Sequence, residues 1–211
     1  KLDRKVFNPE KAYDKLAMIG AKWVRIQSGW ERTEQEKGVY DFEWLDSIVD
    51  NLLERGLVPW INLVYGNGLY DDDAAKVFGA VGCPPVKSEE AKKGWADYIT
   101  ALAAHMKGRI SYYEVWNEPD GEWCWKHGPN GKEYGHVVDT SVALKKGDSS
   151  AKVIGGAICM AKPLDFAYDA FSVGMGEHID AISFHEYVID ETVVFRHVKA
   201  LRGLCNRLIP I

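Results

Sequence analysis

Apolar and polar residues follow two alternating patterns along this chain. Short apolar-rich runs typical of strands occur at residues 23–27, 57–65, 112–116, 151–157 and 179–187. Longer runs with apolar residues three or four positions apart, typical of helices, lie at residues 42–56, 88–107, 132–146 and 163–173, and a last one carries Val194, Val198, Leu201 and Cys205. Strands that alternate with amphipathic helices predict an α/β fold of parallel β/α units.

Capping residues mark where several of these helices begin and end. Asn8 can cap a first helix that starts at Pro9, and Gly20 ends it. Gly56 ends the next helix, whose apolar stripe is formed by Phe42, Leu45, Ile48, Val49, Leu52 and Leu53. The helix at residues 88–107 is expected to bury Ala91, Trp95, Tyr98, Ile99, Leu102 and Met106.

Polar side chains gather where the predicted strands end, namely Arg25, Asn62, Asn117, Glu118, His185 and Tyr187. A doubly wound sheet would predict a glycine-rich phosphate turn after a strand, and neither GxGxxG nor GxxxxGK[ST] occurs in the sequence. In a (β/α)8 TIM barrel, by contrast, the carboxyl ends of the strands form the active-site face. The pattern therefore favours the barrel.

The number of strands is too small for a closed barrel. Five strands and the start of a sixth, at residues 208–211, can be found, whereas a barrel has eight. We therefore expect a single barrel domain over residues 1–211, truncated at both ends, with barrel strands 2 to 6 and the start of strand 7 present. The first residue, Lys1 rather than Met, fits a processed or excised piece.

The composition of the chain limits the classes of binding partner that we expect. The net charge is −5 and no basic stripe is present, which argues against a nucleic-acid partner. No apolar stretch approaches the ~20 residues of a membrane helix, so no membrane partner is expected. No cofactor motif occurs, and the four cysteines lack metal-ligand spacing, although Cys83 and Cys124 could pair if their loops touch.

The segment EVWNEP, residues 114–119, carries the clearest chemical signal. A glycosidase needs a carboxylic acid to protonate the leaving oxygen, and this acid must hold its proton near neutral pH between apolar walls. Glu118 ends a strand beside Trp116, Asn117 and Pro119, which suits that role. From spacing alone, a surface glutamate in a strand-to-helix turn fits equally well.

The same segment resembles the fourth-strand signature of glycoside hydrolase clan A, the retaining enzymes built on a (β/α)8 barrel. Residues 20–31 resemble the clan's second strand, residues 37–67 the second helix and third strand of family 39 and its relatives, and residues 179–187 the sixth strand. The resemblance implies that Glu118 is the acid/base and that Asn117 binds the sugar 2-hydroxyl. It also implies that Arg25 supports the nucleophile and that His185 and Tyr187 line the site.

Strand parity places the histidine and the tyrosine together. Ser183, His185 and Tyr187 share one face of their predicted strand, opposite Ile182 and Phe184. A lone histidine at such a place is usually structural, and the neighbouring tyrosine favours a functional role.

Arg25 lies in an otherwise apolar strand, where an unpaired guanidinium would be costly. It should therefore meet a carboxylate. Glu114 is the nearest partner in the sequence, and we predict that it is a buried structural carboxylate.

Trp123 and Trp125 follow Glu118 and could stack on the C–H faces of sugar rings. The alternative is a loop that packs on itself. The resemblance to clan A implies an oligo- or polysaccharide as the partner.

The second carboxylate of a retaining enzyme has no convincing candidate in this sequence. In clan A it ends the seventh strand, and Ile211 precedes any such glutamate. We therefore predict a retaining β-glycoside hydrolase, acting on β-linked plant or microbial glycans, whose nucleophile strand is missing from this chain.

Two other functions remain. One is a non-catalytic carbohydrate-binding barrel that keeps the cleft without the chemistry. The other is a metal-dependent hydrolase, which would need convergent His and Asp ligands. The six histidines show no such spacing, so no metal is expected.

Overall fold

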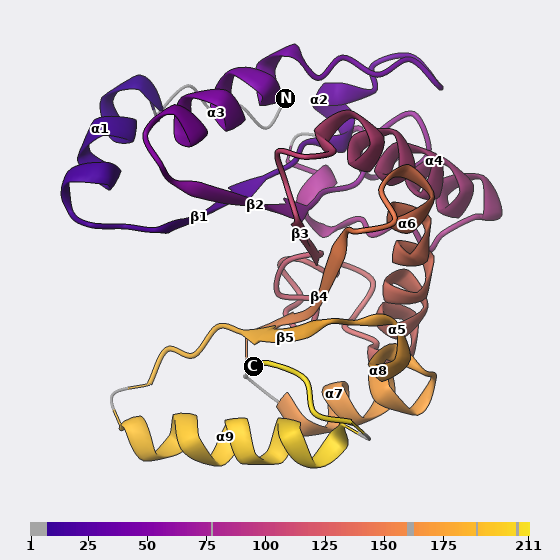
Figure 1. Cartoon of the computed structure of the whole chain (residues 1–211). Coiled ribbons are helices and arrows are strands. Elements are labelled where there is room, and N and C mark those ends of the chain that lie inside the picture. Colours follow the sequence, from indigo (N-terminus) through magenta and orange to yellow (C-terminus); the bar gives the residue numbers. More distant parts are fainter. Residues whose placement is uncertain (1–7, 77, 160–162, 189, 206) are drawn as a thin grey trace.

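Five parallel strands form one sheet whose spatial order is the order of the sequence (Figure 1). The computed structural model describes residues 8–76, 78–159, 163–188, 190–205 and 207–211. The strands are β1 (Trp23–Gln27), β2 (Val58–Leu63), β3 (Tyr112–Val115), β4 (Lys152–Ile158) and β5 (Ala181–Phe184). The predicted α/β fold with a parallel sheet is confirmed.

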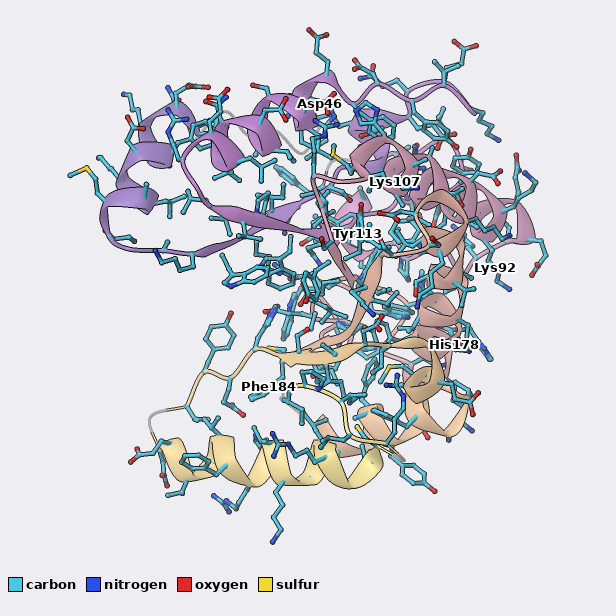
Figure 2. The ribbon with its side chains drawn as sticks, viewed as in Figure 1. Asp46, Lys92, Lys107, Tyr113, His178 and Phe184 are labelled. Atoms are coloured by element: carbon cyan, nitrogen blue, oxygen red, sulfur yellow. The ribbon has the colours of Figure 1, made fainter. Side chains whose placement is uncertain are left out.

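Helices connect successive strands and lie on one side of the curved sheet (Figure 1). They are α1 (Glu10–Met18), α2 (Trp30–Thr33), α3 (Glu43–Glu54), α4 (Glu89–Met106), α5 (Gly131–Thr140), α6 (Leu144–Gly147), α7 (Pro163–Ser172), α8 (Met175–His178) and α9 (Glu191–Leu204), with short 3-10 turns η1 (Ala80–Gly82) and η2 (Ser141–Ala143). Figure 2 shows Tyr113 on the central strand, whereas Asp46, Lys92 and His178 lie out among the helices.

The core lies between the helices and one face of the sheet. Ile61 on β2 is in register with Tyr113 on β3, which is in register with Val153 on β4, and all three are buried. Every residue that the sequence predicts to be buried in α4 is buried. The alternate positions of the strands, Asn62 and Glu114 among them, face the other side of the sheet, where the polar groups meet.

The signals at the helix ends are confirmed. The Asn8 side chain accepts a hydrogen bond from the Glu10 N–H at 3.0 Å, and α4 is capped by Ser88, whose Oγ accepts from the Ala91 N–H at 3.0 Å. Gly20 and Gly56 have φ of 79° and 68°, a left-handed conformation that glycine adopts at little cost. Leu53 is the exception to the predicted stripe of α3, because it is exposed.

The helical segment predicted over residues 132–146 is found, but the prediction that it is a single helix is wrong. The segment is divided into α5, η2 and α6. At the break, the Thr140 hydroxyl donates to the Val137 carbonyl at 2.6 Å, and the Ser141 hydroxyl donates to the Val138 carbonyl. Such hydrogen bonds compete with the regular helical pattern, which here tightens into a 3-10 turn.

The strand predicted over residues 179–187 is shorter than expected, because β5 ends at Phe184. His185 and Tyr187 therefore lie in the segment after the strand, and the predicted alternation of faces does not govern them. His185 still binds the neighbouring strand through its N–H, which donates to the Ile158 carbonyl at 2.7 Å.

The last residues of the chain lie along the free edge of β5. The Ile182 N–H donates to the Pro210 carbonyl at 2.9 Å, and Ile209 is buried. This is the contact that a following parallel strand would make, although no strand is assigned there. A truncated barrel domain over residues 1–211 stays a prediction.

Candidate active site

Glu114 is fully buried on β3, with a side-chain exposure of 0%. Its carboxylate accepts hydrogen bonds from Arg25 Nε at 2.6 Å, from Asn62 Nδ2 at 3.0 Å and from Ser183 Oγ at 2.6 Å. Arg25 Nη2 also lies 2.5 Å from the same carboxylate. The predicted pairing of Arg25 with Glu114 is therefore confirmed, and charge and hydrogen bonding together offset the cost of burying it.

The backbone turns sharply where β3 ends. Trp116 and Glu118 have φ of 65° and 46°, in the left-handed region that side chains other than glycine rarely adopt. Two hydrogen bonds hold the turn on its neighbours: the Trp116 N–H donates to the Leu63 carbonyl at 3.1 Å, and the Glu118 N–H donates to the Ala157 carbonyl at 2.9 Å. Strained backbone held in this way is common at functional sites.

The Glu118 carboxylate is partly accessible, with a side-chain exposure of 16%. One oxygen lies 3.0 Å from His185 Nδ1, and the other accepts from the Trp123 indole N–H at 2.5 Å. Glu118 therefore has two hydrogen-bonding partners from different segments and still reaches solvent. A proton could be exchanged with a bound molecule at this position, which is impossible for the enclosed Glu114.

Asn117, which precedes Glu118 in the sequence, is linked to Glu114 through Arg25. Its Oδ1 accepts from Arg25 Nη2 at 2.9 Å, and its Nδ2 lies 3.6 Å from Cys124 Sγ. Arg25 thus contacts both Glu114 and Asn117. The carboxyl ends of β1 and β3 and the loop after β3 are brought together by these contacts.

The structure does not bring all predicted site residues to this place. Trp123 has an exposure of 53% and lies against Glu118, as expected for a stacking ring. Trp125 has an exposure of 0%, packs between Trp116 and Tyr134, and donates to Glu133 at 3.1 Å. No face of Trp125 is open to a sugar, so the prediction that this ring stacks on substrate is corrected to a packing role.

Tyr187 has an exposure of 79% and lies beyond the end of β5. Its role in lining the site stays a prediction. Tyr65, which faces the same region, is buried and accepts a hydrogen bond from Gln27 Nε2 at 3.1 Å. Burial raises the pKa of the Tyr65 phenol to about 12, so it stays neutral at physiological pH.

Two residues of this region were not predicted as site residues. Asp120 accepts the Cys159 N–H at 2.7 Å and so binds the loop after Glu118 to the end of β4. Ser183 binds Glu114 from β5. The alternation along residues 179–187 places Ser183 on the same face as His185, and this pattern could have identified Ser183 as a site residue. No pattern in the sequence identifies Asp120.

The four cysteines are free thiols, so the open possibility of a Cys83–Cys124 disulfide is not realised. In the described part of the chain, no group of three or more His, Cys, Asp or Glu side chains is arranged to hold a metal ion. No helix among the described residues is long and apolar enough to cross a membrane.

Comparison with known proteins shows the family that this chain resembles over most of its length. The family model described as Glycosyl hydrolases family 39 matches residues 12–199. A curated β-xylosidase from Caldicellulosiruptor saccharolyticus is 29% identical over 189 residues, which cover 82% of this chain and 38% of that protein. The chain thus spans less than two fifths of the length of this relative.

Solved structures share the fold. A monomeric β-xylosidase from Caulobacter crescentus CB15 superposes with a TM-score of 0.73 at 20% identity, covering 96% of this chain and 46% of that one. Xylanase 10B from Thermotoga petrophila RKU-1, solved in complex with xylobiose, gives a TM-score of 0.68 at 17% identity, covering 94% of this chain and 63% of that one. At these identities the likeness is one of fold, that of TIM-barrel glycoside hydrolases.

The family match spans most of the chain, well beyond the EVWNEP segment. The chain belongs to glycosyl hydrolases family 39. The resemblance to clan A, and to family 39 within it, is confirmed.

Proposed function

We propose that the complete protein hydrolyses β-glycosidic bonds with retention of configuration and that Glu118 is its general acid/base. The observation that carries the proposal is the placement of Glu118: a carboxylate at the carboxyl end of a parallel strand, partly exposed and held by His185 and Trp123. Catalytic residues of barrel enzymes lie at these strand ends. Membership of family 39 supports the same reaction class.

The protonated acid would donate to the leaving oxygen of the glycosidic bond. Double displacement then needs a nucleophilic carboxylate about 5–5.5 Å away. We place it on the barrel strand that would follow the segment beside β5, beyond Ile211. After departure of the first product, Glu118 would act as a base and activate the water that releases the second.

Asn117 would bind the sugar hydroxyl adjacent to the reacting carbon. Arg25 holds the Asn117 carbonyl oxygen at 2.9 Å, which leaves the amide nitrogen as the donor. Arg25 would also face the nucleophile when that strand is present. His185 positions the Glu118 carboxylate from the other side.

β-Linked xylose units are the substrate that we favour among β-glycans. A curated relative is named as a β-xylosidase, and a structural neighbour is described in complex with xylobiose. Trp123 would stack on a sugar ring of the leaving group, because its ring is exposed and adjoins the acid.

The test is Glu118→Ala in the complete polypeptide that carries this sequence. Unactivated xylo-oligosaccharides should lose about 100- to 10,000-fold in kcat/KM. Aryl xylosides with good leaving groups should lose much less in the glycosylation step, because they need little acid help, and added azide should restore turnover. Glu122→Ala is the matched control, since Glu122 is an exposed glutamate in the same loop.

An equal loss on both kinds of substrate, without azide rescue, would contradict the role of Glu118. Tight binding of xylo-oligosaccharides with no hydrolysis by the unaltered protein would instead favour a non-catalytic carbohydrate-binding barrel. Isothermal titration calorimetry with the same oligosaccharides separates these outcomes.

A further inference from the structure

Ser183 occupies an unusual place between two strands. Its hydroxyl donates to Glu114 Oε1 at 2.6 Å and accepts a hydrogen bond from the Ala157 N–H at 2.9 Å. It therefore joins a buried carboxylate on β3 to the backbone of β4, although it belongs to β5. One hydroxyl fills both hydrogen-bonding roles that serine offers.

Ala157 lies at an irregular point of β4. The register between β4 and β5 shifts between Gly155 and Ile158, and Ala157 has a φ of 48°. Gly156 has a φ of 113°, and a Cβ built there would lie 2.1 Å from the Ser183 carbonyl oxygen. The backbones of β4 and β5 thus approach each other where only glycine fits.

The carbonyl of this same Ala157 accepts the N–H of Glu118 at 2.9 Å. The Ser183 hydroxyl therefore binds the N–H of Ala157, and the carbonyl of the same residue binds the N–H of Glu118. A second route starts from the same buried carboxylate: Glu114 binds Arg25, and Arg25 binds Asn117. Asn117 and Glu118 are thus held by two different chains of contacts that share Glu114.

We propose that Ser183 is a positioning residue for Glu118 and that it acts through the irregular backbone at Ala157. This inference rests on the proposed role of Glu118 as the acid. Loss of the hydroxyl leaves the Ala157 N–H without its acceptor and removes one donor from Glu114. The left-handed conformations of Ala157 and Glu118 then lose a support that they share. The acid moves relative to the leaving oxygen, whereas Asn117 keeps its hydrogen bond to Arg25, and Arg25 keeps its bond to the other oxygen of Glu114.

The activity test compares Ser183→Ala with Ser183→Thr in the complete polypeptide. Ser183→Ala should lower kcat on unactivated xylo-oligosaccharides by about 10- to 100-fold, because small misplacements of reacting groups have effects of that order. KM and turnover of activated aryl xylosides should change little. Ser183→Thr keeps the hydroxyl at a half-buried position and should restore most of the activity.

Ser28→Ala is the matched control. Ser28 is buried just after β1, and its hydroxyl exchanges hydrogen bonds with the backbone of Val64, at 3.1 Å and 3.2 Å, in the segment after β2. This variant loses a comparable pair of bonds and should keep the leaving-group dependence of the unaltered enzyme. A merely structural role for Ser183 would make both serine variants behave alike, which would overturn the proposal.

A second measurement does not depend on activity. In Ser183→Ala, amide hydrogen exchange should speed up about fivefold at both Ala157 and Glu118, since each net hydrogen bond is worth about 1 kcal/mol. Ser183→Cys, which replaces the hydroxyl with a somewhat larger group that is only a weak donor and acceptor, serves if the alanine variant does not fold. Unchanged exchange at Glu118 would refute the positioning role, whereas faster exchange combined with failure of the Glu118→Ala test would refute only the proposed reaction.

Discussion

Glu114 lies in β3 and Glu118 lies just after the end of this strand. The two glutamates are close in sequence, but their surroundings differ. Glu114 is enclosed by Arg25, Asn62 and Ser183 and has no exposed surface. Glu118 has two partners and remains partly exposed. The comparison shows that the regular strand encloses a carboxylate, whereas the left-handed turn that follows it presents one.

The largest effect expected from this difference is on stability. Glu114→Gln should lower the free energy of unfolding by about 3–5 kcal/mol, because it leaves the Arg25 guanidinium without its charged partner. Glu118→Gln should change the same quantity by about 1 kcal/mol or less. Urea unfolding of both variants, followed by circular dichroism, measures the difference, and equal losses would mean that the two carboxylates are not distinct.

The negative charge of Glu118 should also affect the pKa of the Cys159 thiol. Burial, followed by the charges of Glu118 and Asp120, raises the pKa of the Cys159 thiol to about 11. A raised pKa keeps the thiol protonated below that pH, so at pH 8 its thiolate fraction should be about 100-fold smaller than that of an ordinary cysteine. Iodoacetamide labelling as a function of pH, read by peptide mass spectrometry, should show reactivity that rises only towards that pH.

The same labelling experiment separates the two glutamates. Glu118→Gln removes a nearby negative charge and should lower the pKa of Cys159, which speeds its alkylation. Glu114→Gln should leave this rate unchanged in folded protein, since Glu114 does not contribute to the shift. A faster reaction in both variants would indicate local unfolding rather than charge, and Cys205 provides the internal control.

The smallest effect is expected at the two tryptophans of the loop. Trp125→Phe removes a buried indole and its bond to Glu133, and should lower the free energy of unfolding by about 1–2 kcal/mol. Trp123→Phe should change it by less than about 0.5 kcal/mol, because that ring is exposed. Thermal unfolding of the pair measures both values, and the opposite ranking would contradict the assignment of Trp125 to the core.

Periodic features of the fold could be predicted from the sequence. The stripe of α4 and the strands β1 to β4 follow from apolar spacing, and the pairing of Arg25 with Glu114 follows from the cost of an unpaired charge in a strand. Aperiodic features could not. Residues 121–131 have no period that distinguishes Trp123 from Trp125. The end of β5 at Phe184 coincides with its last pairing to β4, at Ile158, which the sequence pattern of β5 does not contain.

The candidate site could be predicted only in part, because some of its residues belong to a local sequence pattern and others do not. Glu118 and Asn117 stand in a recognisable segment, but their relation to Ser183 depends on the irregular register between β4 and β5. Single residues such as Asp120 acquire their role only when a loop folds back on a strand end. No local pattern encodes that contact.

The order of the strands also bears on synthesis at the ribosome. Each strand pairs with the one made just before it, so the sheet can grow as the chain emerges, with mostly short-range closures. Glu114 finds Arg25 and Asn62 already made, but Ser183 is synthesised 69 residues later. The Glu114 carboxylate therefore receives the Ser183 hydrogen bond only after β5 is made, and a nascent chain halted between these strands would leave Glu114 Oε1 without that donor at the centre of the growing sheet.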